Sequence, residues 1–421
     1  MKKIISLALV TLFGFGVLYA QNDAGYALVE KKLVKLNAAV QDAKKSTNSK
    51  NWLERARAYN ELYNVNIKYL RMGASPDEIK MFFKTDPSET LADKEGNEKH
   101  IYRNITLFYS GGQLTGWDET KWADEKPLDI SAESYKKVLE LSPDLAEAKN
   151  ELTSLKISYE QEGMNAYSQK KYGEALSNFE KILAINTSVG MPAESDTSIV
   201  FYCGFMSMLN KQPDKAIEYL DKAVALNVSD PAVYEFLFTL HMEKQDTIKG
   251  LNYLRAGYEK FPDDKNILLQ LIQTLIDTNN SNEAIEKIQA AKTLDPTNKL
   301  FPFVEGTLYD KLGDVEKAVA GYTKAVELDP TFYDALYNVA VFYYNHGVKM
   351  VEEANDEKEP AAFETKLAEA NGFFQKALAP LEKCREINPA GEGVLTTLKS
   401  LYYRFKMEDK LKEVQQAIDA L

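Results

Sequence analysis

The sequence predicts an all-α fold, a solenoid of antiparallel helix pairs, with one small β-hairpin inserted near the amino terminus. Small and aromatic residues recur 34 residues apart over Lys299–Gly347, and a period of that length is typical of helical repeats. Ala318, Tyr322 and Ala325 follow the i, i+4, i+7 spacing that places them on one helix face. Helix-ending prolines recur at the same 34-residue spacing; they are Pro262, Pro296 and Pro330.

Two successive units of this stretch align residue by residue. Gly306 and Ala340 are small enough for a neighbouring helix to approach closely, and Tyr309 and Tyr343 supply bulk on the same helices. Gly313 turns the chain into the second helix of the pair. This pattern resembles the tetratricopeptide repeat. The resemblance implies a right-handed superhelix whose first helices line a concave groove for a peptide or protein partner.

Residues 1–20 have the build of a secretory signal peptide. Lys2 and Lys3 precede an apolar run, which ends at Ala20 before the polar Gln21. An uncleaved membrane anchor is the alternative, although the run is short for a bilayer span. No cysteine follows the run as a lipid-attachment site. We therefore expect a periplasmic or secreted protein with no integral membrane span after cleavage.

Charge and composition argue against several classes of function. The formal net charge is −12 and becomes −14 once Lys2 and Lys3 are removed, so the acidic surface disfavours nucleic-acid binding. Cys203 and Cys384 lie in different predicted repeats, and we interpret them as small buried residues and not as a disulfide. No metal-ligand spacing or catalytic motif is present. We expect no enzymatic activity, no metal and no cofactor.

Residues 21–145 are expected to hold a capping helix and a first repeat that is split by an insertion. The cap is a helix at Ala24–Lys45, with Leu28 on its apolar face. The split repeat is marked by Trp52, Ala56 and Tyr59 in its first helix and by Ser131, Tyr135 and Val138 in its second. The insertion covers about residues 73–127. It should hold a short helix beginning at Pro76 and a β-hairpin that turns at Ser110-Gly111-Gly112.

Residues 146–391 are expected to form the main repeat array. It should include a long helix over Asp144–Lys170 and a loop over Thr187–Asp196. An acidic insertion at about 348–372 has a helical pattern on both sides of a proline. We expect it to lengthen two helices into a projecting antiparallel pair. Residues 392–421 should close the array as capping helices.

The resemblance also locates candidate binding residues. In tetratricopeptide repeats the groove residues fall at offsets two, five, nine and twelve of each unit. Here those positions are mostly apolar and aromatic with scattered acids, which suits a peptide or amphipathic helix. The candidates are Phe201, Phe205, Met208, Met242, Phe303, Tyr337 and Tyr344, and the same offsets include Leu269, Leu300, Asp310 and Asp334. Packing between adjacent repeats is the alternative role for the aromatic residues.

We therefore expect a non-catalytic exported scaffold for protein–protein interaction or assembly in the cell envelope. The alternative is a glycan-binding or nutrient-uptake accessory protein, in which Trp52, Trp117 and Trp122 would stack on sugars. The general build also resembles exported repeat proteins of the Bacteroidota. Asp246-Thr247-Ile248 resembles the O-glycosylation acceptor of such proteins, which implies a glycan on Thr247. A chance match of so short a triplet is the other reading.

Overall fold

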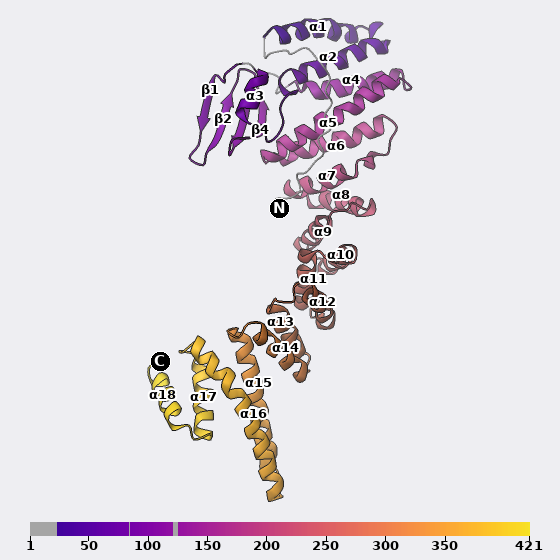
Figure 1. Ribbon diagram of the computed structural model, residues 1–421. Helices are drawn as coiled ribbons and strands as arrows, with labels where there is room; N and C mark the ends of the chain where they lie inside the picture. Colours follow the sequence, from indigo (N-terminus) through magenta and orange to yellow (C-terminus); the bar gives the residue numbers. More distant parts are fainter. Residues whose placement is uncertain (1–22, 84, 121–124) are drawn as a thin grey trace. The chain divides into compact units, whose positions relative to one another are not determined.

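The computed structural model shows an array of helix pairs with one small sheet (Figure 1). It describes residues 23–83, 85–120 and 125–421. Within these ranges the chain has eighteen α-helices, two short 3-10 helices and one four-stranded sheet. The predicted all-α repeat fold with a small β insertion is therefore confirmed. The proposed signal peptide at residues 1–20, and Trp122, lie outside the described residues.

The chain divides into two compact units, Met1–Leu240 and His241–Leu421. The first unit begins with α1 (Asp23–Gln41), η1 (Lys45–Thr47), α2 (Ser49–Ile67) and α4 (Pro127–Leu141). Tyr26 and Val29 of α1 share a core with Tyr59 of α2. The expectation that Leu28 lies on the apolar face of the cap was wrong: Leu28 is exposed, because the buried face of α1 runs through Tyr26 and Val29.

The chain between α2 and α4 forms a short helix and an antiparallel sheet. These are α3 (Pro76–Phe83), β1 (Glu89–Ala92), β2 (Asn97–Ile101), β3 (Ile105–Ser110) and β4 (Gln113–Glu119), in the order β1-β2-β3-β4. The predicted hairpin is confirmed as β3 and β4, which are joined by Gly111 and Gly112, both at positive φ. The expectation of a single hairpin was incomplete. All of β1 is exposed, so its sequence carries no apolar alternation to reveal it.

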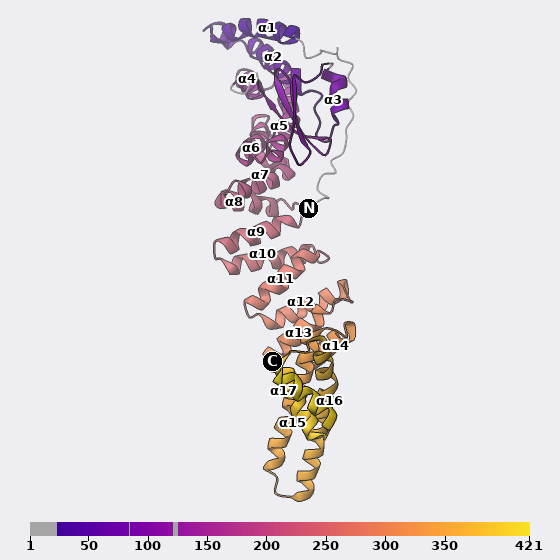
Figure 2. The ribbon, with the colours of Figure 1, turned by 90° about the vertical axis from the view of Figure 1, so that its left-hand side faces the viewer.

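The sheet is fastened to the helical array through β4 and α5 (Ala146–Ser168) (Figures 1 and 2). The backbone N–H of Trp117 donates to Asn165 Oδ1 at 2.9 Å, and Asn165 Nδ2 donates back to the Trp117 carbonyl at 3.0 Å. Gly116 permits this approach, since a Cβ atom there would lie 3.1 Å from Asn165 Oδ1. One asparagine side chain thus pairs with a strand as another strand would.

The rest of the first unit continues as packed helices. They are α6 (Tyr172–Ser188), η2 (Ala193–Ser195), α7 (Thr197–Leu209), α8 (Pro213–Ala225) and α9 (Ala232–Glu243), and the division between the units falls within α9. Gly163 lets α5 close on α6, since a Cβ there would lie 2.7 Å from the Phe179 ring. The loop expected from Thr187 begins only after Ser188. Asn186 Nδ2 holds it by donating to the Ala193 carbonyl at 2.9 Å.

The second unit continues with regular helix pairs. They are α10 (Thr247–Lys260), α11 (Lys265–Asp277), α12 (Ser281–Leu294), α13 (Leu300–Lys311) and α14 (Val315–Leu328). Helices α13 and α14 cross where Gly306 faces Gly321. A Cβ atom on Gly321 would lie 2.7 Å from the Pro302 carbonyl oxygen and 2.8 Å from Gly306 Cα. The backbones are therefore in direct contact, which only glycine permits.

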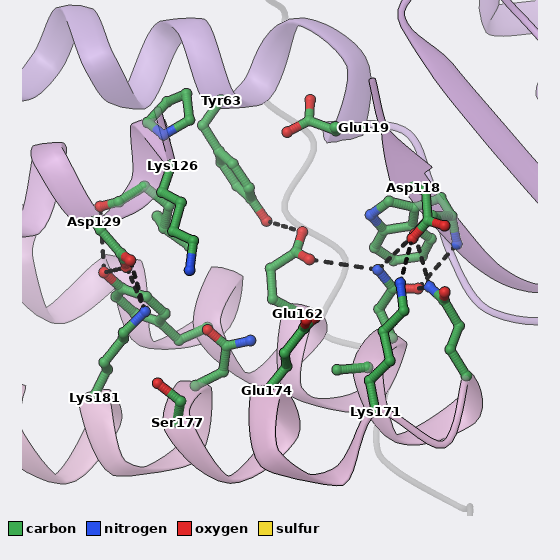
Figure 3. Close-up of a pocket in the computed structure, with 18 residues that line it drawn as sticks. Tyr63, Asp118, Glu119, Lys126, Asp129, Glu162, Lys171, Glu174, Ser177 and Lys181 are labelled. Atoms are coloured by element: carbon green, nitrogen blue, oxygen red, sulfur yellow. Dashed lines mark hydrogen bonds and ion pairs between the residues drawn. The ribbon is translucent and has the colours of Figure 1, made fainter. Parts of the chain in front are cut away.

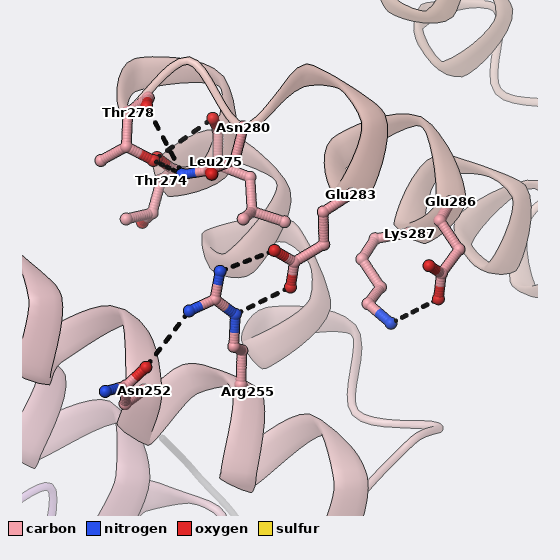
Figure 4. A network of polar contacts seen from close by, with 9 residues as sticks. All are labelled: Asn252, Arg255, Thr274, Leu275, Thr278, Asn280, Glu283, Glu286 and Lys287. Carbon is pink, nitrogen blue, oxygen red and sulfur yellow. Dashed lines mark hydrogen bonds and ion pairs between the residues drawn. The ribbon is translucent and has the colours of Figure 1, made fainter.

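A polar contact links the second helices of two successive pairs (Figure 4). Arg255 of α10 donates from Nε to Glu283 Oε1 of α12 at 2.8 Å and from Nη2 to Glu283 Oε2 at 2.6 Å. Its Nη1 also donates to Asn252 Oδ1 at 3.2 Å. Hydrogen bonding to Arg255 lowers the pKa of Glu283. The planar guanidinium donates to both carboxylate oxygens at once, and this bidentate contact holds the two helices at a fixed spacing.

Replacing Arg255 with lysine is expected to lower the free energy of unfolding by about 0.5 kcal/mol, because an ammonium group cannot make the two-pronged contact. A urea titration of Arg255→Lys, Glu283→Gln and the double variant measures the coupling. We expect the double variant to lose less than the sum of the two single losses. Strict additivity would contradict a direct role for the pair.

The second unit ends in a long helix pair and two shorter helices. They are α15 (Tyr333–Asn355), α16 (Pro360–Ile387), α17 (Glu392–Arg404) and α18 (Glu408–Asp419). Figure 2 shows α15 and α16 running side by side beyond α17. Gly347 seats the Phe374 ring between them, since a Cβ there would lie 2.8 Å from it. The acidic stretch at about 348–372 thus occupies the far ends of α15 and α16 and the turn that joins them.

Candidate functional site

The candidate groove residues of the first unit pack against neighbouring helices. Phe201 is only 6% exposed. Its ring stacks on Phe205 at 6.4 Å between centroids and on Phe236 of α9 at 6.1 Å, and Phe205 stacks on Phe236 at 5.1 Å. Met208 is half-buried at the end of α7. The structure therefore uses these aromatic rings to hold α7 against α9.

Two candidates in the second unit have the same role. The Phe303 ring lies 5.6 Å from Tyr322 of α14 and 4.8 Å from Phe332. The Tyr344 ring lies 5.5 Å from Phe374 of α16. Both side chains are half-buried. Packing between helices, the alternative left open by the sequence, describes these residues well.

Other residues at the groove offsets leave apolar side chains in solvent. Met242 and Tyr337 are 38% and 37% exposed, and Leu269 and Leu300, at the same offsets, are 48% and 51% exposed. These four residues lie on α9, α11, α13 and α15, and all four belong to the unit His241–Leu421. We call Met242, Leu269, Leu300 and Tyr337 the exposed apolar row. Leu269 and Leu300 stand at the same repeat offsets as the predicted groove residues, so their positions are marked by the sequence although their exposure is not.

The first unit contains a polar cavity of about 490 Å³ between the sheet and the helices (Figure 3). Its walls come from α2, β4, the start of α4, α5 and α6. The residues that define its chemistry are Tyr63, Trp117, Asp118, Glu119, Lys126, Asp129, Tyr159, Glu162, Lys171, Glu174 and Lys181. Neighbouring sequence segments do not predict this cavity, because charges at these spacings are typical of solvated helix faces.

Ion pairs occupy two sides of the cavity. Lys171 Nζ donates to Asp118 Oδ1 at 2.8 Å. Lys181 Nζ donates to Asp129 at 2.6 and 2.8 Å, and the Tyr159 hydroxyl donates to the same carboxylate at 2.9 Å. Burial and the Asp129 charge raise the pKa of Tyr159, so this hydroxyl stays protonated and acts as a donor. The pairs connect α6, through Lys181 and through Lys171 just before the helix, to the opposite wall.

Glu162 lies at the centre of the cavity (Figure 3). The Tyr63 hydroxyl donates to its Oε1 at 2.9 Å, and Asn165 Nδ2 approaches its Oε2 at 3.4 Å. Desolvation raises the pKa of Glu162, while these donors and the Trp117 indole act in the opposite direction. Trp117 is 1% exposed, and its Nε1 atom is not within hydrogen-bond distance and angle of an acceptor on any described residue. The indole N–H is thus a buried donor held near a carboxyl group.

Among residues 23–83, 85–120 and 125–421, no three His, Cys, Asp or Glu side chains gather with the geometry of a metal site. Cys203 and Cys384 are buried free thiols, and burial raises the pKa of Cys384 to about 11. A thiol with so high a pKa is a poor nucleophile near neutral pH. None of the described helices combines the length and apolarity required to cross a membrane.

Comparisons with known proteins identify one repeat directly. Residues 306–347 match the family model of the TPR repeat. The Photosystem I assembly protein Ycf3 of Rippkaea orientalis (strain PCC 8801 / RF-1) is 34% identical over 85 residues, which are 20% of this chain and 49% of that protein. This chain therefore spans about half the length of that curated relative.

Solved structures of several repeat proteins are also similar. A MamA structure (AMB-1) shares 20% identity, covers 42% of this chain and 92% of its own, and has a TM-score of 0.33. YrrB, described as a TPR protein with an unusual peptide-binding site, shares 20% identity. The match covers 49% of this chain and 97% of YrrB, with a TM-score of 0.32. A TPR repeats protein from Bacteroides fragilis NCTC 9343 shares 18% identity. The match covers 59% of this chain and 98% of that protein, with a TM-score of 0.28.

Proposed function

We propose that this chain, which is a tetratricopeptide repeat protein, is an exported, non-catalytic scaffold that holds a segment of a partner protein. Tetratricopeptide repeat proteins mediate protein–protein interaction and assembly. The observation that carries the proposal for this chain is the exposed apolar row. Four large apolar side chains remain in solvent at the groove offsets, on four helices that each begin a repeat.

Exposed apolar side chains that recur from repeat to repeat favour an extended or helical partner segment. Such a segment can place an apolar anchor against each repeat in turn. Single exposed apolar residues are common on any surface, whereas exposed apolar residues at groove offsets of four successive repeats argue for a binding face. The charge of the chain favours a partner of opposite sign, because Asp310 and Asp334 are exposed at groove offsets and the formal net charge is −12. We propose an amphipathic segment with apolar anchors and flanking basic residues.

Tyr337→Glu is expected to reduce partner recovery about tenfold, because it places a charge where an apolar anchor should be desolvated. Leu269→Glu should act in the same direction. Tyr403→Glu is the matched control: Tyr403 is 77% exposed on α17 of the same unit and lies outside the groove offsets. The measurement is crosslinking and affinity capture from the cell envelope, with captured proteins quantified by mass spectrometry. Phe201→Glu is unsuitable, because it would disrupt the stack between α7 and α9.

Equal recovery with Tyr337→Glu, Leu269→Glu and Tyr403→Glu would exclude the exposed apolar row as the docking surface. A partner captured equally by all three variants would indicate that the docking surface lies elsewhere, on the long α15–α16 pair or on the sheet. Circular dichroism of each variant separates lost binding from lost fold.

Export is a separate part of the proposal. It is supported by the build of residues 1–20, in which Lys2 and Lys3 precede an apolar run. A mature protein recovered from the periplasm or medium with Gln21 as its first residue is the expected result. Full-length protein in the cytosol would refute this part and leave the binding proposal intact.

The glycan-binding alternative gains no support from the two tryptophans that are described. Trp117 is buried, so neither face of its ring can stack on a sugar. Trp52 is half-buried, its Nε1 donates to the Ser46 carbonyl at 2.8 Å, and the Arg55 guanidinium lies 5.7 Å from its ring centroid.

A further inference from the structure

The outward face of α1 combines exposed apolar side chains with exposed lysines. Leu28 is 60% exposed and Val34 is 71% exposed. Lys31 and Lys35 are also exposed, and Leu28, Lys31 and Lys35 stand at i, i+3 and i+7, which places them on one face of the helix. Val34 lies three residues beyond Lys31 and borders the same face. We call Leu28, Lys31, Val34 and Lys35 the α1 outer face.

The chain is basic in this region, although it is acidic as a whole. Residues 31–50 contain six lysines and one acidic residue, Asp42, whereas the formal net charge of the chain is −12. The lysines, all exposed, are Lys31, Lys32, Lys35, Lys44, Lys45 and Lys50. Lys32 Nζ lies 3.8 Å from Glu61 Oε2 of α2, and Lys45 interacts with Asp42. The other four lysines form no ion pair with the side chains that the structure describes.

The α1 outer face is open to an approaching surface. Figures 1 and 2 show α1 at the end of the row of helices that continues through α2, α4 and α5. Its inward face packs on α2 through Tyr26 and Val29. In the sequence, only Gln21 and Asn22 separate α1 from the apolar run that ends at Ala20, which is at most about 10 Å of extended chain. Export that brings this run to a membrane therefore brings α1 to the membrane as well.

We propose that the α1 outer face docks on an anionic phospholipid surface. The ammonium groups of Lys31 and Lys35 would meet the phosphates of the headgroups, while Leu28 and Val34 would enter between the headgroups. The same surface repels the acidic remainder of the chain, so the protein should bind in one orientation, with α1 towards the lipid. The proposal does not involve the exposed apolar row and does not rest on the scaffold proposal.

The composition of the α1 outer face favours a lipid surface over a protein partner. The centres of protein interfaces are enriched in tryptophan, tyrosine and arginine. The four residues of this face include none of these types and consist of two aliphatic side chains and two lysines. Lysine is suited to a membrane surface, because its aliphatic stem can lie along apolar groups while its ammonium group stays in water. An acidic protein and a second copy of this acidic chain are the other occupants that the charge would allow.

The direct test is cosedimentation with phospholipid vesicles. The chain from Gln21 onward is used, because the apolar run at residues 1–20 would insert into vesicles by itself. Binding is expected to phosphatidylcholine vesicles that contain about 30% phosphatidylglycerol, and should be at least about tenfold weaker on pure phosphatidylcholine. It should also fall steeply between about 0.05 M and about 0.5 M salt, as screening shortens the reach of the lysine charges.

Lys31→Gln combined with Lys35→Gln is expected to weaken binding to the anionic vesicles at least about tenfold, because two cations that meet the headgroups are removed. Lys399→Gln combined with Lys412→Gln is the matched control. These exposed lysines belong to α17 and α18, and their replacement makes the same change in net charge. The control should alter the affinity less than about twofold, since it leaves the α1 outer face intact.

Val34 and Ile157 provide a matched test of the apolar contact, because both are 71% exposed and both belong to the first unit. A polarity-sensitive fluorophore attached at Val34→Cys should shift its emission to the blue when anionic vesicles are added. The same label at Ile157→Cys, on α5, should not shift. The natural thiols of Cys203 and Cys384 are buried and should remain unlabelled.

Several outcomes would overturn the proposal. They are equal binding to both kinds of vesicle, an unchanged affinity in the Lys31→Gln and Lys35→Gln double variant, an equal shift at both labelled positions, or no binding at low salt. Absence of vesicle binding together with a dimer in sedimentation velocity that this double variant abolishes would assign the face to a second copy. Absence of vesicle binding together with an acidic envelope protein whose capture requires both lysines would assign it to a protein partner.

Discussion

Replacing Gly321 with alanine is expected to lower the free energy of unfolding of the second unit by about 2 kcal/mol. The added Cβ would lie 2.7 Å from the Pro302 carbonyl oxygen and 2.8 Å from the Gly306 backbone. Both obstacles are main-chain atoms, which cannot move aside as a flexible side chain can. Helices α13 and α14 would have to separate. The pair would then lose the packing of Ala318 and Tyr322 of α14 against Gly306 of α13. This loss exceeds the gain of about 1 kcal/mol that alanine brings to a helix interior.

Gly372→Ala is the matched control for this substitution. Gly372 lies inside α16, and a Cβ atom there would meet nothing within 4 Å. The same change of residue should therefore raise the free energy of unfolding by about 0.5–1 kcal/mol, because alanine restricts the unfolded chain and favours the helix. Urea denaturation of both variants measures the difference in sign.

The effect of Gly321→Ala should also be local. Each repeat of a solenoid contacts only its neighbours, so a separated α13–α14 pair should weaken protection there first. Hydrogen exchange followed by mass spectrometry should show faster exchange over residues 300–328, with little change in α17 and α18. Uniform acceleration across His241–Leu421 would contradict the account of a local steric effect.

The repeat fold could be predicted because its packing requires particular residues at fixed positions. Gly306 and Gly313 each meet a physical requirement, backbone contact for the first and a φ of 78° for the second. The positive φ recurs 34 residues apart, at Lys211, Gln245 and Asn279 as well as at Gly313, whereas Ile272 and Phe238 replace Gly306 at the equivalent positions of the two preceding pairs. Strand β1 has no comparable requirement. Its four residues are exposed, and backbone hydrogen bonds to β2 hold it in the sheet. These bonds do not require particular side chains.

The candidate site was predictable only in part. The repeat offsets selected positions on the first helices, yet they could not distinguish Phe201, buried against Phe236, from Leu269, left in solvent. Burial at these positions depends on the neighbouring repeat, which an offset does not describe. The cavity was not predictable, since Tyr63, Trp117 and Glu162 come from three separate segments. The packing of α2 and of β4 on α5 brings these side chains together.

Asn165 makes two of the hydrogen bonds in that docking, and Asn165→Ala is expected to lower the free energy of unfolding of the first unit by about 2–3 kcal/mol. Asn165 accepts from the Trp117 N–H at 2.9 Å and donates to the Trp117 carbonyl at 3.0 Å. Trp117 and Asn165 are both buried. Alanine would leave the Trp117 N–H without a partner and without access to water. Thermal unfolding by circular dichroism measures the loss.

Gln169→Ala is the control that separates the two halves of this contact. Gln169 Nε2 donates to the same Trp117 carbonyl at 2.8 Å, but it leaves the N–H to Asn165. Its removal should cost less than about 1 kcal/mol, because the carbonyl keeps one donor. An equal loss in the two variants would show that the carbonyl, and not the N–H, controls the docking of the sheet.

The same pair of variants tests whether the loss of stability comes from detachment of the sheet. Trp117 lines the cavity from β4, while Glu162 and Asn165 belong to α5. If Asn165→Ala releases β4 from α5, hydrogen exchange followed by mass spectrometry should show faster exchange of the β4 amides, whereas Gln169→Ala should keep most of their protection. Unchanged protection of β4 in Asn165→Ala would instead show that other contacts hold the insertion on the helical array.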